Sequence, residues 1–371
     1  MHVPRVGAVR VCRSAGDVLG NLHLTSWVLA QLSRAFYAAL TLGVLAASPG
    51  AVVNAATTLD AVKARGHVVC GVRADVVGFS QVDARGRWSG LEVDFCRALA
   101  AAALGSKDAI EFWAVSNSER YRLLSRGEID VLAGGADFTL SRDTELGVRF
   151  VDTLFHDGTM FMVRRSQNIF SALELSGASV CVLEGARGKA EVAEFFEMRG
   201  MRYQPVASSS WTDVVNAYLS GSCNAIAGEM SILAAARMKF PVPQEHAILP
   251  DSISKEPIGP AVRQGDERWF SIVRWTLMAL IRAEELGVTS KNAEAKLSST
   301  RPSVRRLLGV NFNFGQAMGL NADWAYQAIL QVGNYGELFE RNLGSRSPLR
   351  LERGLNKLWA EGGLMYAMPL R

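Results

Sequence analysis

Two extended, mostly apolar stretches organise this chain: Gly158-Thr-Met-Phe-Met-Val163 and Ile258-Gly-Pro-Ala-Val-Arg263. Short apolar runs of this kind, bounded by glycine, proline or charged residues, are typical of buried strands. Each stretch separates one series of short strands and helices from the next. If both stretches cross between lobes, the residues between them form one lobe, and the residues on either side form a second, discontinuous lobe.

Strand and helix signals alternate outward from these stretches. The first series has strands predicted at 68–72, 110–114 and 129–133, with helices at 91–103 and 118–126. The second series has strands at 180–183 and 224–227, with helices near 188–199, 212–219 and 230–238. This alternation predicts an α/β fold with mostly parallel sheets.

The last third of the chain is rich in helix signals. Apolar faces recur at helical spacing over residues 267–286, 323–332 and 351–360, and we expect these faces to pack on the first lobe. The expected organisation is a leader over 1–55, lobe 1 beginning at 56–159 and lobe 2 over 160–257. Residues 258–371 then complete lobe 1 and add a C-terminal helical extension.

Composition excludes several classes of protein. The chain has 371 residues, of which 49% are hydrophobic and 20% charged, enough for about two globular domains. Its net charge is +4, but the first 55 residues hold four arginines and one aspartate, or +3, which leaves about +1 for the remainder. The charge therefore gives no support for nucleic-acid binding.

The leader has the pattern of a secretory signal. Arg34 precedes the uncharged run 35–47, the breaker Ser48-Pro49-Gly50 follows, and Val53-Asn54-Ala55 offers small residues for cleavage. The run is shorter than the roughly 20 apolar residues that span a bilayer. We therefore expect export as a soluble protein after cleavage of the leader, with an N-terminal anchor helix as the alternative.

Four cysteines follow the leader: Cys70, Cys96, Cys181 and Cys223. An even number in an exported chain favours disulfides, and the four form two local pairs, one in each series. We predict the bonds Cys70–Cys96 and Cys181–Cys223; four unpaired buried thiols are the alternative. No Cys-x-x-Cys or histidine-rich spacing points to a metal, so none is expected.

Several stretches resemble the periplasmic amino-acid-binding proteins of ABC uptake systems, in particular the general L-amino-acid-binding subfamily of family 3 of the solute-binding proteins. The strongest are Ile253-Ser-Lys-Glu-Pro-Ile-Gly-Pro-Ala-Val-Arg-Gln-Gly-Asp266 and Val332-Gly-Asn-Tyr-Gly-Glu-Leu-Phe-Glu-Arg-Asn342. Others lie at 58–72, 90–99, 127–131 and 141–144. The resemblance runs from about residue 57 to the C-terminus.

The resemblance implies a two-lobe periplasmic-binding-protein fold of type II, whose lobes are joined by two crossing strands and close on a ligand. It also implies a monomer that delivers an L-amino acid to the membrane permease of an ABC transporter when closed. No enzyme activity, cofactor or nucleic-acid partner is expected. The phosphate-binding pattern Gly-x-x-x-x-Gly-Lys-Ser/Thr does not occur in the sequence, so ATP binding is not expected in this chain.

Two charged residues are the main candidates for binding. Arg142 falls where relatives place the arginine that binds the ligand α-carboxylate, and a guanidinium suits that role because it offers two parallel N–H donors. Glu229 falls where relatives carry an aspartate for the ammonium group. The alternative for Arg142 is an exposed arginine at the start of a helix.

The predicted pocket departs from the family pattern at two loops. Hydroxyl-rich stretches are replaced by Gly134-Gly135-Ala136-Asp137-Phe138-Thr139 and by Glu184-Gly185-Ala186-Arg187-Gly188. Arg187 can replace the lost donors and Asp137 can hold the ammonium, or both are solvated loop charges. Phe79 is placed either as a wall of the pocket or in the core. The full predicted ligand-binding set is Phe79, Gly135, Asp137, Thr139, Arg142, Ala186, Arg187 and Glu229.

Two alternatives stay open beside an amino-acid receptor. One is a degenerate receptor or sensor with an altered ligand. The other is a periplasmic dehydratase-type enzyme on the same fold, with Asp137, Glu184 and Glu229 as acid–base candidates. Because Asp137 and Glu229 place two anions at one site, charge complementarity favours a ligand other than an acidic amino acid.

Overall fold

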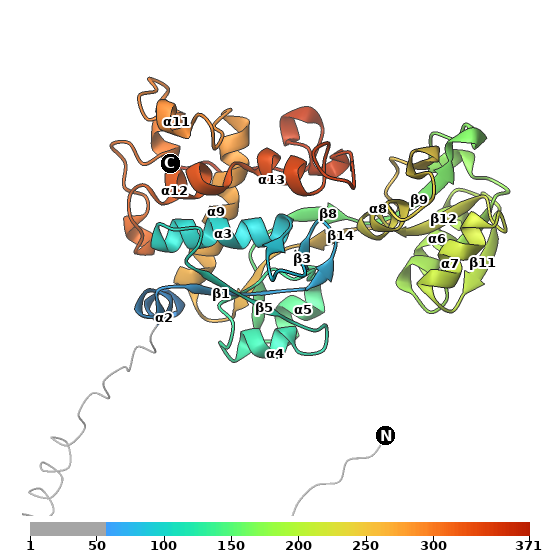
Figure 1. Cartoon of the computed structure of the whole chain (residues 1–371), viewed down its shortest axis with the longest axis horizontal. Coiled ribbons are helices and arrows are strands. Elements are labelled where there is room, and N and C mark those ends of the chain that lie inside the picture. Colours follow the sequence, from blue (N-terminus) through green and yellow to red (C-terminus); the bar gives the residue numbers. More distant parts are fainter. Residues whose placement is uncertain (1–56) are drawn as a thin grey trace, which may run out of the picture. The chain divides into compact units, whose positions relative to one another are not determined.

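Two five-stranded sheets carry the fold of residues 57–371, which are the residues that the computed structural model describes (Figure 1). The leader predicted at 1–55 lies outside the described residues. Helices cover both sheets, so the predicted α/β class is confirmed. No described helix combines the length and the apolar character needed to cross a bilayer.

The first sheet has the strand order β5-β1-β6-β15-β7. Its strands are β1 (Val68–Val72), β5 (Ile110–Ala114), β6 (Val131–Leu132), β7 (Val148–Phe150) and β15 (Ala261–Arg263). β1 is parallel to β5 and β6, whereas β15 is antiparallel to β6 and β7. β1 pairs with a strand on each edge, and all of its residues are buried. Its largely valine sequence is typical of a strand covered on both faces.

The second sheet repeats this arrangement with the order β11-β10-β12-β9-β13. Its strands are β9 (Thr159–Arg164), β10 (Ser179–Leu183), β11 (Gln204–Ser208), β12 (Ala225–Glu229) and β13 (His246–Ile248). β10 is parallel to β11 and β12, and β9 is antiparallel to β12 and β13. Half of the pairings in each sheet are thus antiparallel, so the expectation of mostly parallel sheets was wrong.

A separate two-stranded sheet lies in the chain just before the antiparallel strands β9 and β15. It pairs β8 (Phe155–Asp157) with β14 (Glu256–Ile258). β8 precedes β9 of the second sheet, and β14 precedes β15 of the first, so the chain passes from one sheet to the other through this pair. β9 and β15, the strands that follow β8 and β14, each run antiparallel to both of their neighbours in the five-stranded sheets.

The stretch 258–263, expected as a single extended segment, is split into β14 and β15 at Gly259. A Cβ on Gly259 would lie 2.1 Å from the carbonyl oxygen of Asp152, so the backbones approach too closely for any other residue. The stretch 158–163 belongs to the second sheet as β9, and the paired crossing residues come just before it, in β8.

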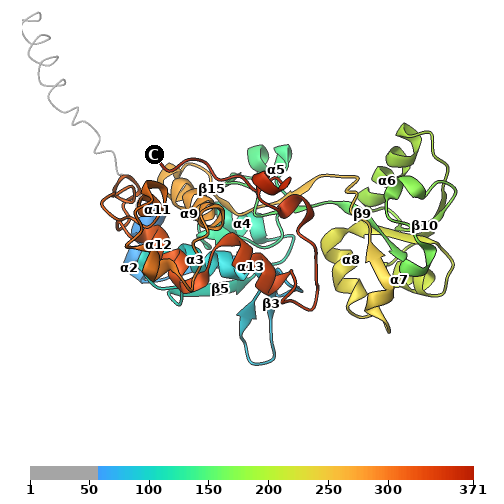
Figure 2. The same ribbon diagram turned by 90° about the horizontal axis from the view of Figure 1, so that it is seen from above.

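Long helices pack beside the first sheet. α3 (Leu91–Leu104), α9 (Glu267–Glu285) and α12 (Trp324–Val332) contact one another, and both views show them together (Figures 1 and 2). α9 and α12 confirm the packing predicted for 267–286 and 323–332. A further helix that was not predicted, α13 (Tyr335–Asn342), begins at a capping box formed by Asn334 and Glu337.

The helix predicted over 351–360 does not form. That segment contains the 3₁₀ turn Gly354–Asn356, an isolated β-bridge from Leu358 to Met365 and the start of the 3₁₀ turn Trp359–Glu361. Gly354, within the segment, has positive φ, which interrupts a right-handed helix, and Gly362, just after the segment, has it too. The buried Asn356 side chain instead bonds the backbone of His156 in β8, accepting from its N–H at 2.7 Å and donating to its carbonyl at 3.1 Å.

The remaining elements are short. A hairpin sheet joins β2 (Asp75–Val76), β3 (Ser80–Val82) and β4 (Trp88–Ser89). The other helices are α2 (Thr58–Arg65), α4 (Arg120–Ser125), α5 (Leu140–Glu145), α6 (Arg187–Met198), α7 (Trp211–Leu219), α8 (Met230–Arg237), α10 (Ala293–Lys296) and α11 (Pro302–Leu307). Among these, α6, α7 and α8 all contact the second sheet (Figure 1).

Both predicted disulfides are present. Cys70 of β1 bonds Cys96 of α3, and Cys181 of β10 bonds Cys223, which lies just before β12. The first bond thus joins a strand to the helix packed beside it, and the second joins a strand to the loop before its neighbouring strand. The alternative of four free thiols is therefore excluded.

Candidate functional site

The predicted binding residues gather around the β8–β14 pair. The loop after β6 runs beside β14: Asp137 forms an isolated antiparallel bridge with Ile258, and the N–H of Phe138 donates to the carbonyl of Pro257 at 2.7 Å. Glu229 ends β12 and faces Thr159 of β9 across the ladder. Thr159 follows β8 after a single glycine, so three separate parts of the chain meet here.

Arg142 and Asp137 pair with each other. Nη1 of Arg142 lies 2.6 Å from Oδ2 of Asp137 and also donates to the Asp137 carbonyl at 3.1 Å. Their side chains are 29% and 22% exposed, so both remain accessible to a ligand. Thr139 is the N-cap residue of α5, but its side chain makes no capping bond.

Arg187 opens α6 and reaches the β8–β14 pair. Its Nη2 lies 3.0 Å from Oε1 of Glu256, and its Nε lies 3.4 Å from Oε1 of Glu191. Partial burial disfavours the charged guanidinium, but the nearby carboxylates of Glu256 and Asp137 outweigh that effect and raise the pKa of Arg187. Ala186 precedes it as the N-cap residue of α6, with extended backbone angles.

Two buried acids of the site were not predicted from the sequence. Burial, followed by the charge of Glu229, raises the pKa of Glu256 to about 7. Burial also raises the pKa of Asp157 to about 6, although the Ser231 hydroxyl donates to its Oδ2 at 2.5 Å. No motif distinguishes these residues, because each is a lone acid in a short strand.

The site therefore combines two guanidinium groups with several carboxyl groups. The cations are Arg142 and Arg187, and the carboxyl groups are those of Asp137, Asp157, Glu191, Glu229 and Glu256. Such an arrangement can bind a zwitterion, because it offers both signs of charge within one region. No group of three or more side chains able to hold a metal ion occurs among residues 57–371.

Two predicted residues have other partners in the structure. Phe79 is buried in the core with its ring edge-on to Phe155, at 4.9 Å between centroids, which favours the packing alternative stated for it. The N–H of Gly135 donates to Oε1 of Glu92 at 2.6 Å, so this backbone donor is directed into the protein.

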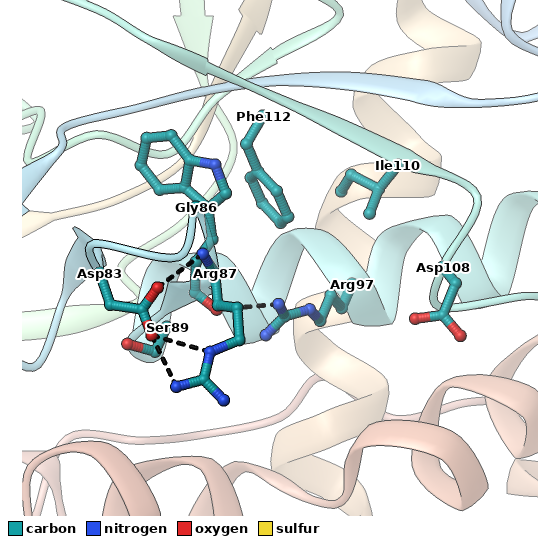
Figure 3. Close-up of a pocket in the computed structure, with 9 residues that line it drawn as sticks. Asp83, Gly86, Arg87, Ser89, Arg97, Asp108, Ile110 and Phe112 are labelled. Carbon is teal, nitrogen blue, oxygen red and sulfur yellow. Dashed lines mark hydrogen bonds and ion pairs between the residues drawn. The ribbon is translucent and has the colours of Figure 1, made fainter.

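A surface pocket of about 620 Å³ lies apart from these residues (Figure 3). It is formed by the β3–β4 hairpin, the middle of α3 and the edge strand β5 with the loop before it. Arg97 lies over the Phe112 ring there at 5.6 Å, and Arg87 pairs with Asp83 at 2.7 Å. None of the predicted binding residues lines it.

Comparison with known proteins identifies the family. Residues 68–292 match the bacterial extracellular solute-binding proteins, family 3. The general L-amino acid-binding periplasmic protein AapJ of Rhizobium johnstonii is 46% identical over 332 residues, covering 89% of this chain and 97% of that protein. The glutamate/glutamine/aspartate/asparagine-binding protein BztA of Rhodobacter capsulatus is 42% identical over 338 residues, covering 91% of this chain and 99% of that protein.

A solved structure shares the fold at similar identity. It is an ABC transporter periplasmic binding protein from Brucella ovis with glutathione bound, 44% identical, with a TM-score of 0.72. The match covers 85% of this chain and all of that chain. This agrees with the two-lobe binding-protein fold expected from the sequence.

Proposed function

Because the chain belongs to the bacterial extracellular solute-binding proteins of family 3, we propose that it is the amino-acid-binding receptor of an ABC transporter. The relatives named above are binding proteins and not enzymes, so the receptor is favoured over the dehydratase alternative. Their names also support the periplasm as its location. Over nine-tenths of each curated relative named above is matched by this chain.

The observation that carries this proposal is the pairing of opposite charges at the β8–β14 strands. Both hydrogen bonds that Arg142 makes within residues 57–371 use Nη1. Its Nε and Nη2, the other edge of the guanidinium, remain for a bidentate bond to an α-carboxylate. Asp137 and Glu229 then provide carboxylates for the α-ammonium, with Arg187 beside them. Ala186 and Thr139 contribute backbone at the same loops, whereas both backbone groups of Gly135 are bonded within the protein.

The proposed domain organisation follows from the passage of the chain through β8 and β14. Lobe 1 comprises 56–159 and 258–371, including the C-terminal extension, and lobe 2 comprises 160–257. The ligand lies between the lobes, which carry Arg142 and Arg187 respectively. The closed monomer then docks on the permease subunits of the transporter, with no nucleic-acid partner.

The excess of carboxyl groups favours a ligand whose side chain is neutral or positive. Glu256 and Asp157 are buried with raised pKa values, so another carboxylate placed beside them either meets like charge or requires one of these acids to take up a proton. By its name, BztA binds glutamate, glutamine, aspartate and asparagine. Of these four, glutamine and asparagine meet this condition directly, whereas glutamate and aspartate do so only if a proton is taken up.

A γ-glutamyl peptide is the second candidate, favoured by the glutathione in the 44% identical structure. Glutathione presents a free α-ammonium and α-carboxylate on its glutamyl residue, so the same charged groups can bind its head. Its tail requires more space than a single amino acid.

Calorimetric titration of ligand-free protein with glutamine, glutamate, arginine, histidine and glutathione tests the proposal. We expect binding of at least one amino acid and weaker binding of glutamate at pH 8 than of glutamine. Tight glutamate binding at pH 8 would contradict the charge argument. No heat with any of the five compounds would favour the degenerate receptor, and turnover assays on prephenate-like acids would test the enzyme alternative.

A further inference from the structure

The loop that leads into the candidate site is held by a buried carboxyl group. Glu92, in the first turn of α3, is 1% exposed. Its Oε1 accepts the N–H of Gly135 at 2.6 Å, and its Oε2 accepts the Ser80 hydroxyl at 2.8 Å. The carboxyl group thus bonds the loop directly and is itself fixed by a side chain of β3.

A buried guanidinium holds the same loop through its carbonyl groups. Arg120, at the start of α4, is 6% exposed, and its Nη1 donates to the carbonyl of Gly134 at 2.9 Å and to that of Gly135 at 3.0 Å. Its Cζ lies 4.9 Å from the centroid of the Tyr121 ring. Within the described residues, Nε of Arg120 has no hydrogen-bond partner. The positive charge of Arg120 acts on the buried Glu92, whose pKa it lowers against the larger effect of burial.

The two glycines fit a loop pressed against the end of β1. A Cβ on Gly134 would lie 3.0 Å from the backbone nitrogen of Arg73 and 3.1 Å from Cα of Val72. Gly135 has a φ of 59°, a conformation that favours glycine. Two residues later comes Asp137, which pairs with Arg142, so the backbone path at 134–135 determines where both charged groups lie.

We propose that Glu92 and Arg120 are positioning residues for ligand binding. Glu92 accepts from an N–H of the 134–137 loop and Arg120 donates to its carbonyl groups, and together they orient Asp137 and Arg142. Burying two charged groups is costly unless their hydrogen bonds are satisfied, and charge-assisted bonds to backbone are stronger than neutral ones. Here both groups bond Gly135, and Arg120 also bonds the carbonyl of Gly134. This inference rests on the proposed function, since it assigns the loop to ligand binding.

Asp94 provides a matched control on the same helix. It lies two residues after Glu92 and is also buried, but its carboxylate pairs with Arg97 at 3.1 Å and with Arg341 of α13 at 2.7 Å. It also accepts from the amide of Asn342. Glu92→Ala and Asp94→Ala therefore each remove a buried carboxylate at the start of α3, but only the first contacts the loop.

Hydrogen exchange of the purified full chain, followed by mass spectrometry, tests the loop without ligand. In Glu92→Ala, we expect the peptide covering residues 133–139 to exchange at least tenfold faster than in the unchanged protein. Asp94→Ala should leave that peptide within twofold and instead affect α13. Glu92→Gln, whose amide oxygen can still accept from Gly135, should restore slow exchange. If Glu92→Ala does not fold, Glu92→Met keeps most of the buried volume and serves instead.

Calorimetry with L-glutamine then tests the effect on binding, at a temperature well below the Tm of each variant. We expect Kd to rise 10- to 100-fold in Glu92→Ala, less than threefold in Glu92→Gln, and less than threefold in Asp94→Ala. Unchanged exchange of 133–139 in Glu92→Ala would overturn the inference, as would equal losses of affinity in Glu92→Ala and Asp94→Ala. Faster exchange of the loop with no glutamine binding by the unchanged protein would support the loop contact while counting against the proposed ligand class.

Discussion

Arg187 and Glu256 form an ion pair between the first residue of α6 and the first residue of β14, with Nη2 3.0 Å from Oε1. Arg187 is 52% exposed, whereas the Glu256 side chain is almost fully buried. The pair therefore links a helix that contacts the second sheet to the strand through which the chain returns to the first. The charge of Arg187 lowers the pKa of the buried Glu256, which burial and other carboxylates raise.

Replacing Arg187 should move the pKa of Glu256 further upward. The guanidinium is the neighbouring positive charge that lowers this pKa, and without it burial and the Glu229 charge act unopposed. Because Arg187 is half exposed, we expect Arg187→Gln to raise the pKa by about one unit or less. Carboxyl-carbon NMR titration measures this. Lys189→Gln, which removes a cation paired with Glu184, is the control and should leave the Glu256 titration unchanged.

Arg142→Ala should weaken amino-acid binding by about 2–5 kcal/mol without unfolding the protein, because it removes a charged donor and leaves Asp137 unpaired. Calorimetric titration with L-glutamine measures the loss. Arg149→Ala is the matched control, since Arg149 pairs with Glu267 on an exposed surface. An affinity equal to that of the unchanged protein in Arg142→Ala would assign this arginine a purely structural role.

The two disulfides should stabilise the fold by similar amounts. They span 26 and 42 residues, which corresponds to about 3.5 and 4 kcal/mol in the chain-entropy treatment. Urea unfolding of Cys96→Ser and Cys223→Ser should therefore show losses of this size. Non-reducing mass measurement of the exported protein should show two oxidised pairs; four thiols open to alkylation would contradict the structure.

Glu92 should make stability depend on pH. Burial raises its folded-state pKa from 4.5 to about 7, so the folded protein holds this proton more tightly than the unfolded chain does. The associated stabilisation is complete below about pH 4.5 and is lost as pH rises through 7, a change of about 3 kcal/mol. Glu92→Gln does not titrate there. Its stability relative to the unchanged protein, measured by urea unfolding, should therefore increase from pH 5 to pH 8, and a constant difference would contradict the raised pKa.

Asn356→Ala should cost about 2–3 kcal/mol of stability, because it leaves the N–H and the carbonyl of His156 without the side-chain partner that they share. Urea unfolding measures the loss. Asn321→Ala, at an exposed position, is the control and should change stability by less than about 0.5 kcal/mol. A comparable loss in both variants would show that the contact between the C-terminal segment and β8 adds nothing.

The strands and helices of both sheets were largely predictable from local sequence. The predicted strands 68–72 and 110–114 coincide with β1 and β5, and the helix predicted at 91–103 is α3 less its final residue. These elements have strong apolar patterns that persist over one strand or several helical turns. The disulfide pairs were predictable for a related reason, since each joins neighbouring elements.

The helix predicted over 351–360 failed because its conformation depends on distant residues. Apolar spacing alone suggested a helix there, but Asn356 bonds a strand 200 residues earlier in the chain, and Gly354, which has positive φ, interrupts the segment. Local periodicity contains no information about such a partner. The antiparallel placement of β9 and β15 was missed for the same reason.

The charged residues of the candidate site could be predicted from the sequence and the family resemblance. They are Arg142, Asp137, Arg187 and Glu229. Their pairing required the folded chain: Arg142 binds Asp137 five residues away, whereas Arg187 binds Glu256. The buried acids Glu256, Asp157 and Glu92 had no sequence signal, because a raised pKa arises from burial and from charges on other elements. Side-chain type is a local property of the sequence, but the solvation and the electrostatic field around a side chain exist only once distant segments have been packed together.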